Sequence, residues 1–97
     1  MLSSKQVKYL KSLANTLESK YKIGKNEITH NTIVLLDNAL KKHELIKVSL
    51  NNTVSEEKVQ IAESLSEQLH CEEVQIVGNI ITLFRKNLKD GKIHLPN

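Results

Sequence analysis

Apolar residues recur at intervals of three and four in three segments of the chain, and this spacing places them on one face of a helix. Three amphipathic helices are therefore predicted, each with an apolar stripe turned toward a core. The residues expected in these stripes are Val7, Leu10, Leu13, Ala14 and Leu17 in the first helix, Ile33, Leu36, Ala39 and Leu40 in the second, and Val59, Ala62, Leu65 and Leu69 in the third.

Polar residues mark the expected helix ends. Ser3 or Ser4 can cap the first helix and Thr29 the second, because their hydroxyls accept hydrogen bonds from the unpaired N–H groups of a first turn. The second helix should end near Lys41 and Lys42, cations that suit a helix C-terminus. For the third helix the predicted cap is Ser55, which two glutamates follow.

Shorter segments of branched or alternating apolar residues predict four strands. Gly78-Asn79 separates the last two segments by two residues, a connection typical of a β-hairpin. The predicted strands are Tyr21–Ile23, which stops at Gly24, then Leu45–Leu50, Val74–Val77 and Ile80–Phe84.

Together these segments predict one α/β domain over residues 1–97, of order α-β-α-β-α-β-β. Helices that alternate with strands imply parallel pairing through right-handed crossovers, and the final hairpin adds an antiparallel member. The expected fold is a four-stranded mixed sheet covered by helices. The tail Lys92–Pro96 is expected to be extended.

The composition of the chain argues against several classes of function. Aromatic residues make up only 3% of the chain, which argues against base recognition by rows of stacked rings. The single cysteine, Cys71, excludes an internal disulfide and is compatible with a reducing cytosol. No apolar run approaches a membrane span, and the N-terminus lacks the apolar core of a secretory signal. A cytoplasmic protein without a membrane partner is expected.

The net charge of +3 is unevenly distributed. Residues 1–25 carry six lysines and one acid, residues 85–92 carry four cations and one acid, and residues 51–75 carry six glutamates and one lysine. If the two ends of the chain lie together, they form a basic face suited to phosphates, and the middle forms an acidic one. The alternative is that these lysines are solvated and serve only solubility.

Six segments, in order from about residue 3 to the end, match a known family. They are Ser4-Lys5-Gln6 with Leu10 and Leu13-Ala14, Ile23-Gly24-Lys25-Asn26, His43-Glu44-Leu45-Ile46-Lys47-Val48, Val74-Gln75-Ile76-Val77-Gly78, Leu83-Phe84-Arg85, and Lys92-Ile93-His94-Leu95-Pro96. In these segments the chain resembles the YhbY-like proteins, the free-standing bacterial form of the CRM domain (chloroplast RNA splicing and ribosome maturation).

This resemblance implies a fold similar to the C-terminal domain of translation initiation factor three. It also implies an RNA-binding protein that associates with ribosomal RNA in precursors of the large ribosomal subunit and assists ribosome assembly. Ribosomal proteins are possible additional partners, and a monomer without a cofactor is expected. A rival interpretation is an adaptor whose acidic third helix docks a basic ribosomal protein.

The family usually carries a G-x-x-G turn before the second helix, comparable with the KH-domain loop that clamps a nucleic-acid backbone. Here the turn is Gly24-Lys25-Asn26-Glu27, so a glutamate replaces the second glycine. A carboxylate at that position would repel a phosphate, whereas glycine allows its close approach. The resemblance therefore implies RNA binding by Gly24, Lys25 and Asn26 but not by Glu27; the alternative is a plain turn.

Other cations complete the candidate RNA site. Lys5, Lys8 and Lys11 form a ladder outside the apolar stripe of the first helix, which either meets successive phosphates or is an ordinary solvated face. The resemblance places Lys22, Lys47 and Arg85 nearby. Arg85 can bind a phosphate through two hydrogen bonds, stack on a base, or pair with an acid such as Glu44.

No catalytic or metal site is predicted. Gly24-Lys25-Asn26 lacks the upstream glycine and the following Ser or Thr of a phosphate-binding P-loop. No nucleophile stands in a recognisable catalytic motif, and no histidine has metal-ligand spacing. His43 is expected to cap a helix or to form an internal hydrogen bond, with RNA contact as the alternative. Cys71 is expected to be a buried small apolar residue.

Overall fold

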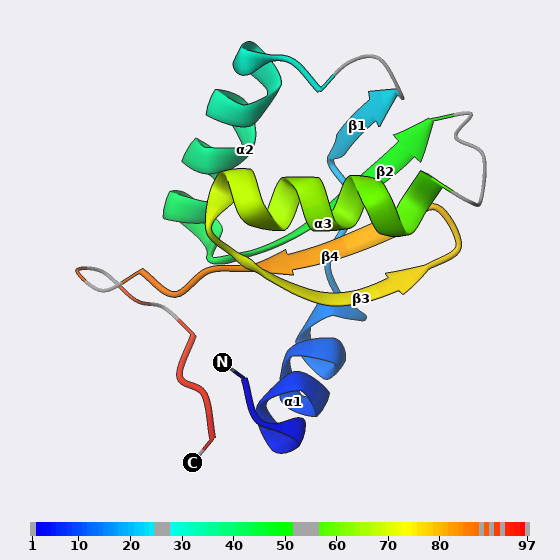
Figure 1. Ribbon diagram of the computed structural model, residues 1–97. Coiled ribbons are helices and arrows are strands. Elements are labelled where there is room, and N and C mark those ends of the chain that lie inside the picture. The colour runs from blue at the N-terminus through cyan, green and yellow to red at the C-terminus, as the bar shows by residue number, and fades with distance from the viewer. Residues whose placement is uncertain are drawn as a thin grey trace.

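The computed structural model describes residues 2–24, 28–51, 57–87, 89, 91 and 93–96. Its elements follow the predicted order α-β-α-β-α-β-β (Figure 1). They are α1 (Ser4–Ala14), β1 (Tyr21–Gly24), α2 (His30–His43), β2 (Leu45–Asn51), α3 (Lys58–Leu69), β3 (Glu72–Val77) and β4 (Ile80–Phe84).

The four strands form one mixed sheet in the order β1-β2-β4-β3, which confirms the predicted fold class. β1 pairs in parallel with β2, and α2 connects them. β4 lies between β2 and β3 and is antiparallel to both. Consequently β1, β2 and β3 run in one direction, and α3 carries the chain across β4 to reach the far edge.

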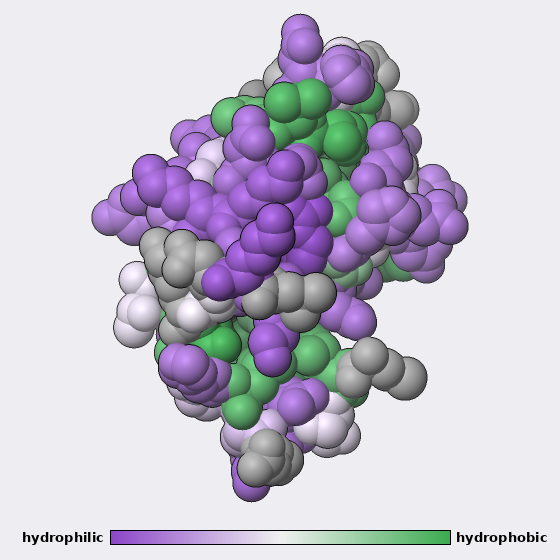
Figure 2. Space-filling model, turned by 90° about the vertical axis from the view of Figure 1, so that its left-hand side faces the viewer, coloured by the Kyte–Doolittle hydropathy of each residue, from purple (hydrophilic) through white to green (hydrophobic). Residues whose placement is uncertain are grey.

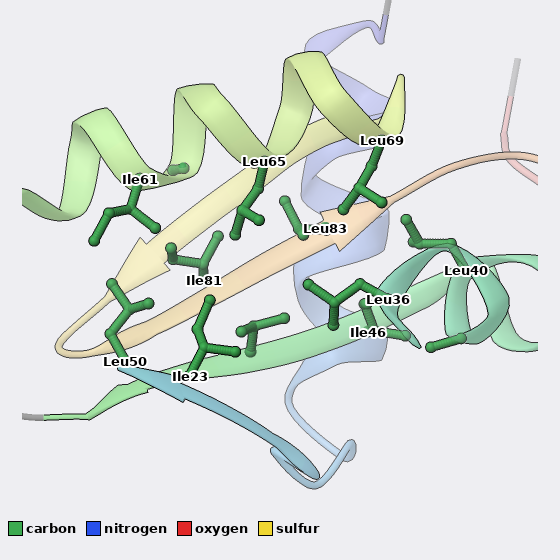
Figure 3. Packing of buried hydrophobic residues seen from close by; sticks show 13 residues of the cluster. Ile23, Leu36, Leu40, Ile46, Leu50, Ile61, Leu65, Leu69, Ile81 and Leu83 are labelled. Atoms are coloured by element: carbon green, nitrogen blue, oxygen red, sulfur yellow. The ribbon is translucent and has the colours of Figure 1, made fainter. Parts of the chain in front are cut away.

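One face of the sheet packs against α2 and α3 through the larger hydrophobic cluster. Along β2 the alternate residues Ile46, Val48 and Leu50 point to this face, as the two-residue period of a strand requires. Figure 3 shows Ile61, Leu65 and Leu69 of α3 above β4, with Leu36 and Leu40 of α2 beside β2. The buried members are Ile23, Leu36, Ala39, Leu40, Ile46, Val48, Leu50, Ile61, Ala62, Leu65, Leu69, Ile81 and Leu83.

The opposite face carries a smaller cluster beneath α1. Leu10 and Ala14 of α1 meet Leu45, Val74 and Phe84 of the sheet. Partly buried residues from both ends of the chain pack around them: Leu2, Val7, Leu13, Ile93 and Leu95. Hydrophobic side chains show in the lower part of Figure 2, at the level of α1 and the C-terminal residues.

A register shift near the start of β3 supplies one member of this smaller cluster. Glu73 pairs with Leu83 and Gln75 with Thr82, so Val74 is an extra residue on its strand. Val74 is only 6% exposed and belongs to the smaller cluster on the α1 side. The hairpin turn at Gly78-Asn79 is confirmed, and Gly78 has the positive φ of +59° that glycine tolerates best.

The predicted caps of the first two helices are confirmed, with Ser3 rather than Ser4 at the first. Ser3 and Gln6 form a capping box, in which the Gln6 N–H donates to Ser3 Oγ (3.2 Å) and the Ser3 N–H to Gln6 Oε1 (3.0 Å). Thr29 Oγ1 accepts from the Thr32 N–H. The prediction for α3 is wrong: the helix begins at Lys58 with Glu57 at the N-cap position, and Ser55 lies outside the described residues.

Two predicted core positions are also wrong. Leu17 lies beyond the end of α1 at Ala14 and is 38% exposed, because the chain leaves the helix before the stripe reaches it. Val59 is 55% exposed, and Ile61 is buried in its place. Ile61 stands four residues before Leu65 and shares its face, whereas Val59 stands six residues before it, about 120° around the helix.

Candidate nucleic-acid interface

Three lysines line the exposed side of α1. Lys5, Lys8 and Lys11 are all exposed, while Leu10 and Ala14 hold the other side of the helix against the sheet. The apolar stripe thus orients the lysine ladder by packing its opposite side. The structure confirms that these three residues share a solvent-facing surface and leaves their RNA contact a prediction.

Two further lysines point to the same side of the sheet as α1. Ile23 belongs to the larger cluster, so its neighbour Lys22 on β1 faces the α1 side. On β2, Lys47 stands between Ile46 and Val48 and likewise faces this side. Lys47 is half-buried, and its Nζ donates to the Leu17 carbonyl at 3.2 Å. Lys22 and Lys47 therefore lie on the same side of the sheet as α1, the basic side.

The predicted backbone clamp is described only in part. Gly24 is the last residue of β1, the edge strand that also carries Lys22. Lys25, Asn26 and Glu27 lie outside the described residues. The clamp and the effect of Glu27 therefore stay predictions from the sequence.

The lysines of α1 and the glutamates of α3 lie on opposite faces of the sheet. α1 and its lysines lie on the face of the smaller cluster, and α3, with exposed Glu63 and Glu67, covers the opposite face. The two described ends of the chain meet, since Gln6 Nε2 donates to the Pro96 carbonyl at 3.1 Å. The condition attached to the charge distribution, that the two ends of the chain lie together, is met by this contact.

Arg85 is engaged inside the protein. Its Nη1 donates to Asp37 Oδ1 (2.8 Å) and to the Leu69 carbonyl (2.7 Å), and its Nη2 donates to the Asp37 carbonyl (3.0 Å). The hydrogen bond from Arg85, stronger than the opposing effect of burial, lowers the pKa of Asp37. Of the three roles considered for Arg85, pairing with an acid is the one observed, with Asp37 and not Glu44.

Glu44 has a structural role that sequence reasoning missed. Its side chain is buried, and its two carboxylate oxygens accept from the main-chain N–H groups of Asn87 (2.7 Å) and Ile93 (2.8 Å). Glu44 also occupies the C-cap of α2 with a φ of 64°, so the predicted cap role of His43 is wrong. His43 is exposed instead, because the chain turns one residue later.

Comparison with known proteins decides the family. A family model described as the CRS1/YhbY (CRM) domain matches residues 2–85. The chain belongs to the CRM family. The match covers α1, the whole sheet and the start of the C-terminal segment, so every described lysine of the basic side falls within it.

Relatives and a solved structure agree with this assignment. The chain is 35% identical over 96 residues to the Probable RNA-binding protein YqeI of Bacillus subtilis, covering 99% of this chain and 100% of that protein. It is 36% identical over 95 residues to an RNA-binding protein of Haemophilus influenzae, covering 98% and 95%. The solution structure of SAV1595 from Staphylococcus aureus is similar, with a TM-score of 0.84, 38% identity, and 99% and 100% coverage.

Other candidate chemistry in this CRM domain is limited. Among the described residues, no three His, Cys, Asp or Glu side chains gather to hold a metal ion. No helix in that part of the chain is both long and apolar enough to cross a membrane. Cys71 is half-buried against the larger cluster, and burial raises the pKa of its thiol to about 11.

Lys20 belongs to the basic side of the CRM domain, although sequence reasoning did not select it. It is exposed immediately before β1 and lines a pocket together with Lys47. The signal in the sequence was the pair Lys20 and Lys22 flanking Tyr21, but the position of Lys47 beside them depends on the pairing of β1 with β2.

Proposed function

We propose that this CRM domain binds RNA through its basic side, with the lysine side chains neutralising backbone phosphates. The observation that carries the proposal is the gathering of lysines from α1, β1 and β2 on one side of the sheet, opposite the acidic α3. Lysine ammonium groups contact phosphates without reading the bases, so this surface positions the RNA and provides affinity. The contributing residues are Lys5, Lys8, Lys11, Lys22 and Lys47.

The family supports the choice of RNA as ligand. Relatives that align over nearly their whole length are named RNA-binding proteins, and none of those compared above is named as an enzyme. The finer part of the proposal is that the RNA is ribosomal RNA in precursors of the large subunit. The protein would act there as a cytoplasmic, monomeric, non-catalytic assembly factor.

The main test replaces Lys5, Lys8 and Lys11 together with Ala. RNA affinity should fall, and the slope of log affinity against log salt should become shallower by about 0.7 to 0.9 for each lost phosphate contact. The matched control replaces three lysines outside the basic side, Lys41, Lys42 and Lys58, and changes the net charge equally. An unchanged slope in a folded α1 variant, or an equal change in the control, would remove α1 from the RNA site.

The ribosomal part of the proposal needs a separate test. Gradient sedimentation of a lysate at low salt should place part of the protein with free large subunits or their precursors, and little with translating ribosomes. Recovery only at the top of the gradient contradicts this part and leaves RNA binding itself unaffected.

A further inference from the structure

A pocket opens at the junction of α1, the segment that leads to β1, the start of β2, the end of α2 and the C-terminal segment. Its volume is about 540 Å³. The pocket exists because β1 is short: its first residue, Tyr21, pairs with Val48, so no described strand flanks Leu45–Lys47 on that edge. The space that a longer β1 would fill is left open beside the basic side.

The segment that forms one wall is held in place from β2. Lys47 Nζ donates to the Leu17 carbonyl, and the hydroxyls of Ser19 and Ser49 are hydrogen-bonded to each other. These two contacts explain why Leu17 stays beside the pocket although its side chain is 38% exposed. The pocket is therefore preformed and does not require the ligand to order it.

The lining combines an apolar wall with cations at the rim. Leu17 and Tyr21, which also packs against the larger cluster, are apolar residues of the lining, Lys20 and Lys47 contribute positive charge, and His43 contributes a polar ring. Glu18 is the acidic group on the lining. A ligand that suits this lining has a flat apolar body and an anionic group, and the volume lies within the range of about 300 to 1,000 Å³ typical of small-ligand sites.

We propose that the pocket takes one unstacked nucleotide of the bound RNA, an inference that rests on the proposed function. Its base would lie against Tyr21 and Leu17, and its phosphate would lie near Lys20 and Lys47. Unpaired bases in RNA are recognised by stacking on aromatic side chains, and a single ring suits a single base. The pocket is lined by Leu13 of α1, Tyr21 of β1 and Lys47 of β2, and these three elements also carry the lysines of the basic side.

The consequence is a preference for RNA with an unpaired residue. The test measures the affinity of the full chain for two RNA hairpins of equal stem length, one perfectly paired and one with a single bulged adenosine. The parent should bind the bulged hairpin about five- to tenfold more tightly, the size of effect that one stacked base provides. The Leu17→Glu variant, which places a carboxylate in the pocket, should lose this preference and keep its affinity for the paired hairpin within about twofold of the control variant.

Val34→Glu is the matched control, since Val34 is 44% exposed on α2, outside the pocket, and the change in charge is the same. Equal affinities of the parent for the two hairpins, or a preference that survives Leu17→Glu, would overturn the assignment while RNA binding stands. Failure to bind either hairpin would instead contradict the proposed function.

A final measurement separates a nucleotide within RNA from a free one. Adenosine monophosphate should perturb the Tyr21 ring signals in the NMR spectrum of the parent only weakly, at millimolar concentrations, and not those of Leu17→Glu. Tight binding of the mononucleotide without any preference for the bulged hairpin would identify a free nucleotide as the ligand and overturn the assignment to RNA.

Discussion

The two faces of the sheet differ in how much they bury. Among the described residues, the α2–α3 face gathers thirteen buried hydrophobic residues, and the α1 face gathers five. The smaller cluster is completed by partly buried residues from both ends of the chain, including Leu2 and Leu95. One face thus supplies most of the hydrophobic stabilisation, while the other, with less of its area covered, keeps lysines and a pocket accessible.

The chemistry of the two sides follows the same division. On the α2–α3 side, Arg85 is paired internally with Asp37. On the α1 side, Lys5, Lys8 and Lys11 extend into solvent. A charge engaged by internal hydrogen bonds stabilises the fold, whereas an exposed lysine is available to a phosphate. Position in the fold, more than residue type, therefore separates structural from binding cations.

The largest effect is expected from a cavity in the α2–α3 face. Leu65→Ala should lower the free energy of unfolding by about 3 to 5 kcal/mol, because Leu65 is fully buried among side chains that cannot collapse into the space. Leu10→Ala in the smaller cluster should cost less, about 2 to 3 kcal/mol, since the chain ends around it can relax. Urea denaturation of both variants measures the difference, and equal losses would contradict the comparison.

The next effect concerns the attachment of the C-terminal segment to the α1 face. Glu44→Gln should destabilise the fold by about 1.5 to 3 kcal/mol, because the amide cannot accept from both the Asn87 and the Ile93 N–H groups as the carboxylate does. Amide exchange at Ile93 should accelerate more than exchange in α3. The exposed Glu73→Gln serves as control, and unchanged exchange at Ile93 would show that Glu44 does not anchor this segment.

A smaller effect is expected at the ion pair of the α2–α3 side. The pKa of Asp37 in the folded protein lies below its ordinary value of 3.8. The stabilisation that its ionised carboxylate provides is therefore complete above pH 3.8 and is lost as the pH falls through the lowered pKa. Asp37→Asn should cost about 1 kcal/mol at neutral pH, a modest figure because the side chain is partly exposed, and nothing in strong acid. Unfolding measured between pH 7 and about pH 2 tests this; a constant difference would contradict it.

The smallest change to the protein is needed for a measurement of how fast the Cys71 thiol reacts. Its thiol pKa of about 11, against an ordinary 9.0, means roughly a hundredfold less thiolate at pH 8. Alkylation by iodoacetamide should be slower in the folded protein by at least that factor and normal in urea. Because Cys71 packs against the larger cluster, Leu65→Ala should accelerate the reaction and Leu10→Ala should affect it little.

Much of the fold could be predicted because its signals are local. The capping box at Ser3, the cap at Thr29 and the turn at Gly78-Asn79 each depend on residues a few positions apart. The prediction of Leu17 as a core residue was wrong because α1 ends at Ala14, and that of Val59 was wrong because Ile61, not Val59, shares the buried face of Leu65. Helix boundaries depend on tertiary packing as well as on local preference, so periodicity alone does not locate them.

The candidate RNA site could likewise be predicted only where its signals are local. The α1 lysines follow from a helical stripe, and their side of the helix was predictable once the apolar side was known. For Arg85 the sequence left pairing with an acid as one of three alternatives and did not identify the partner, because Asp37 lies 48 positions away. Nor did it indicate the pocket, which depends on β1 starting opposite Val48.

The sequence by itself determined the order of elements, the class of the sheet, the α1 lysine ladder and membership of the CRM family. Periodicity and capping act over one or two turns of chain, and a family resemblance is carried by the residues themselves. Only the tertiary structure decided that Glu44 holds the C-terminal segment, that Arg85 is internal, and that Lys20 and Lys47 line one pocket. Such contacts join residues tens of positions apart, and they form only when the sheet has set its strand order and register.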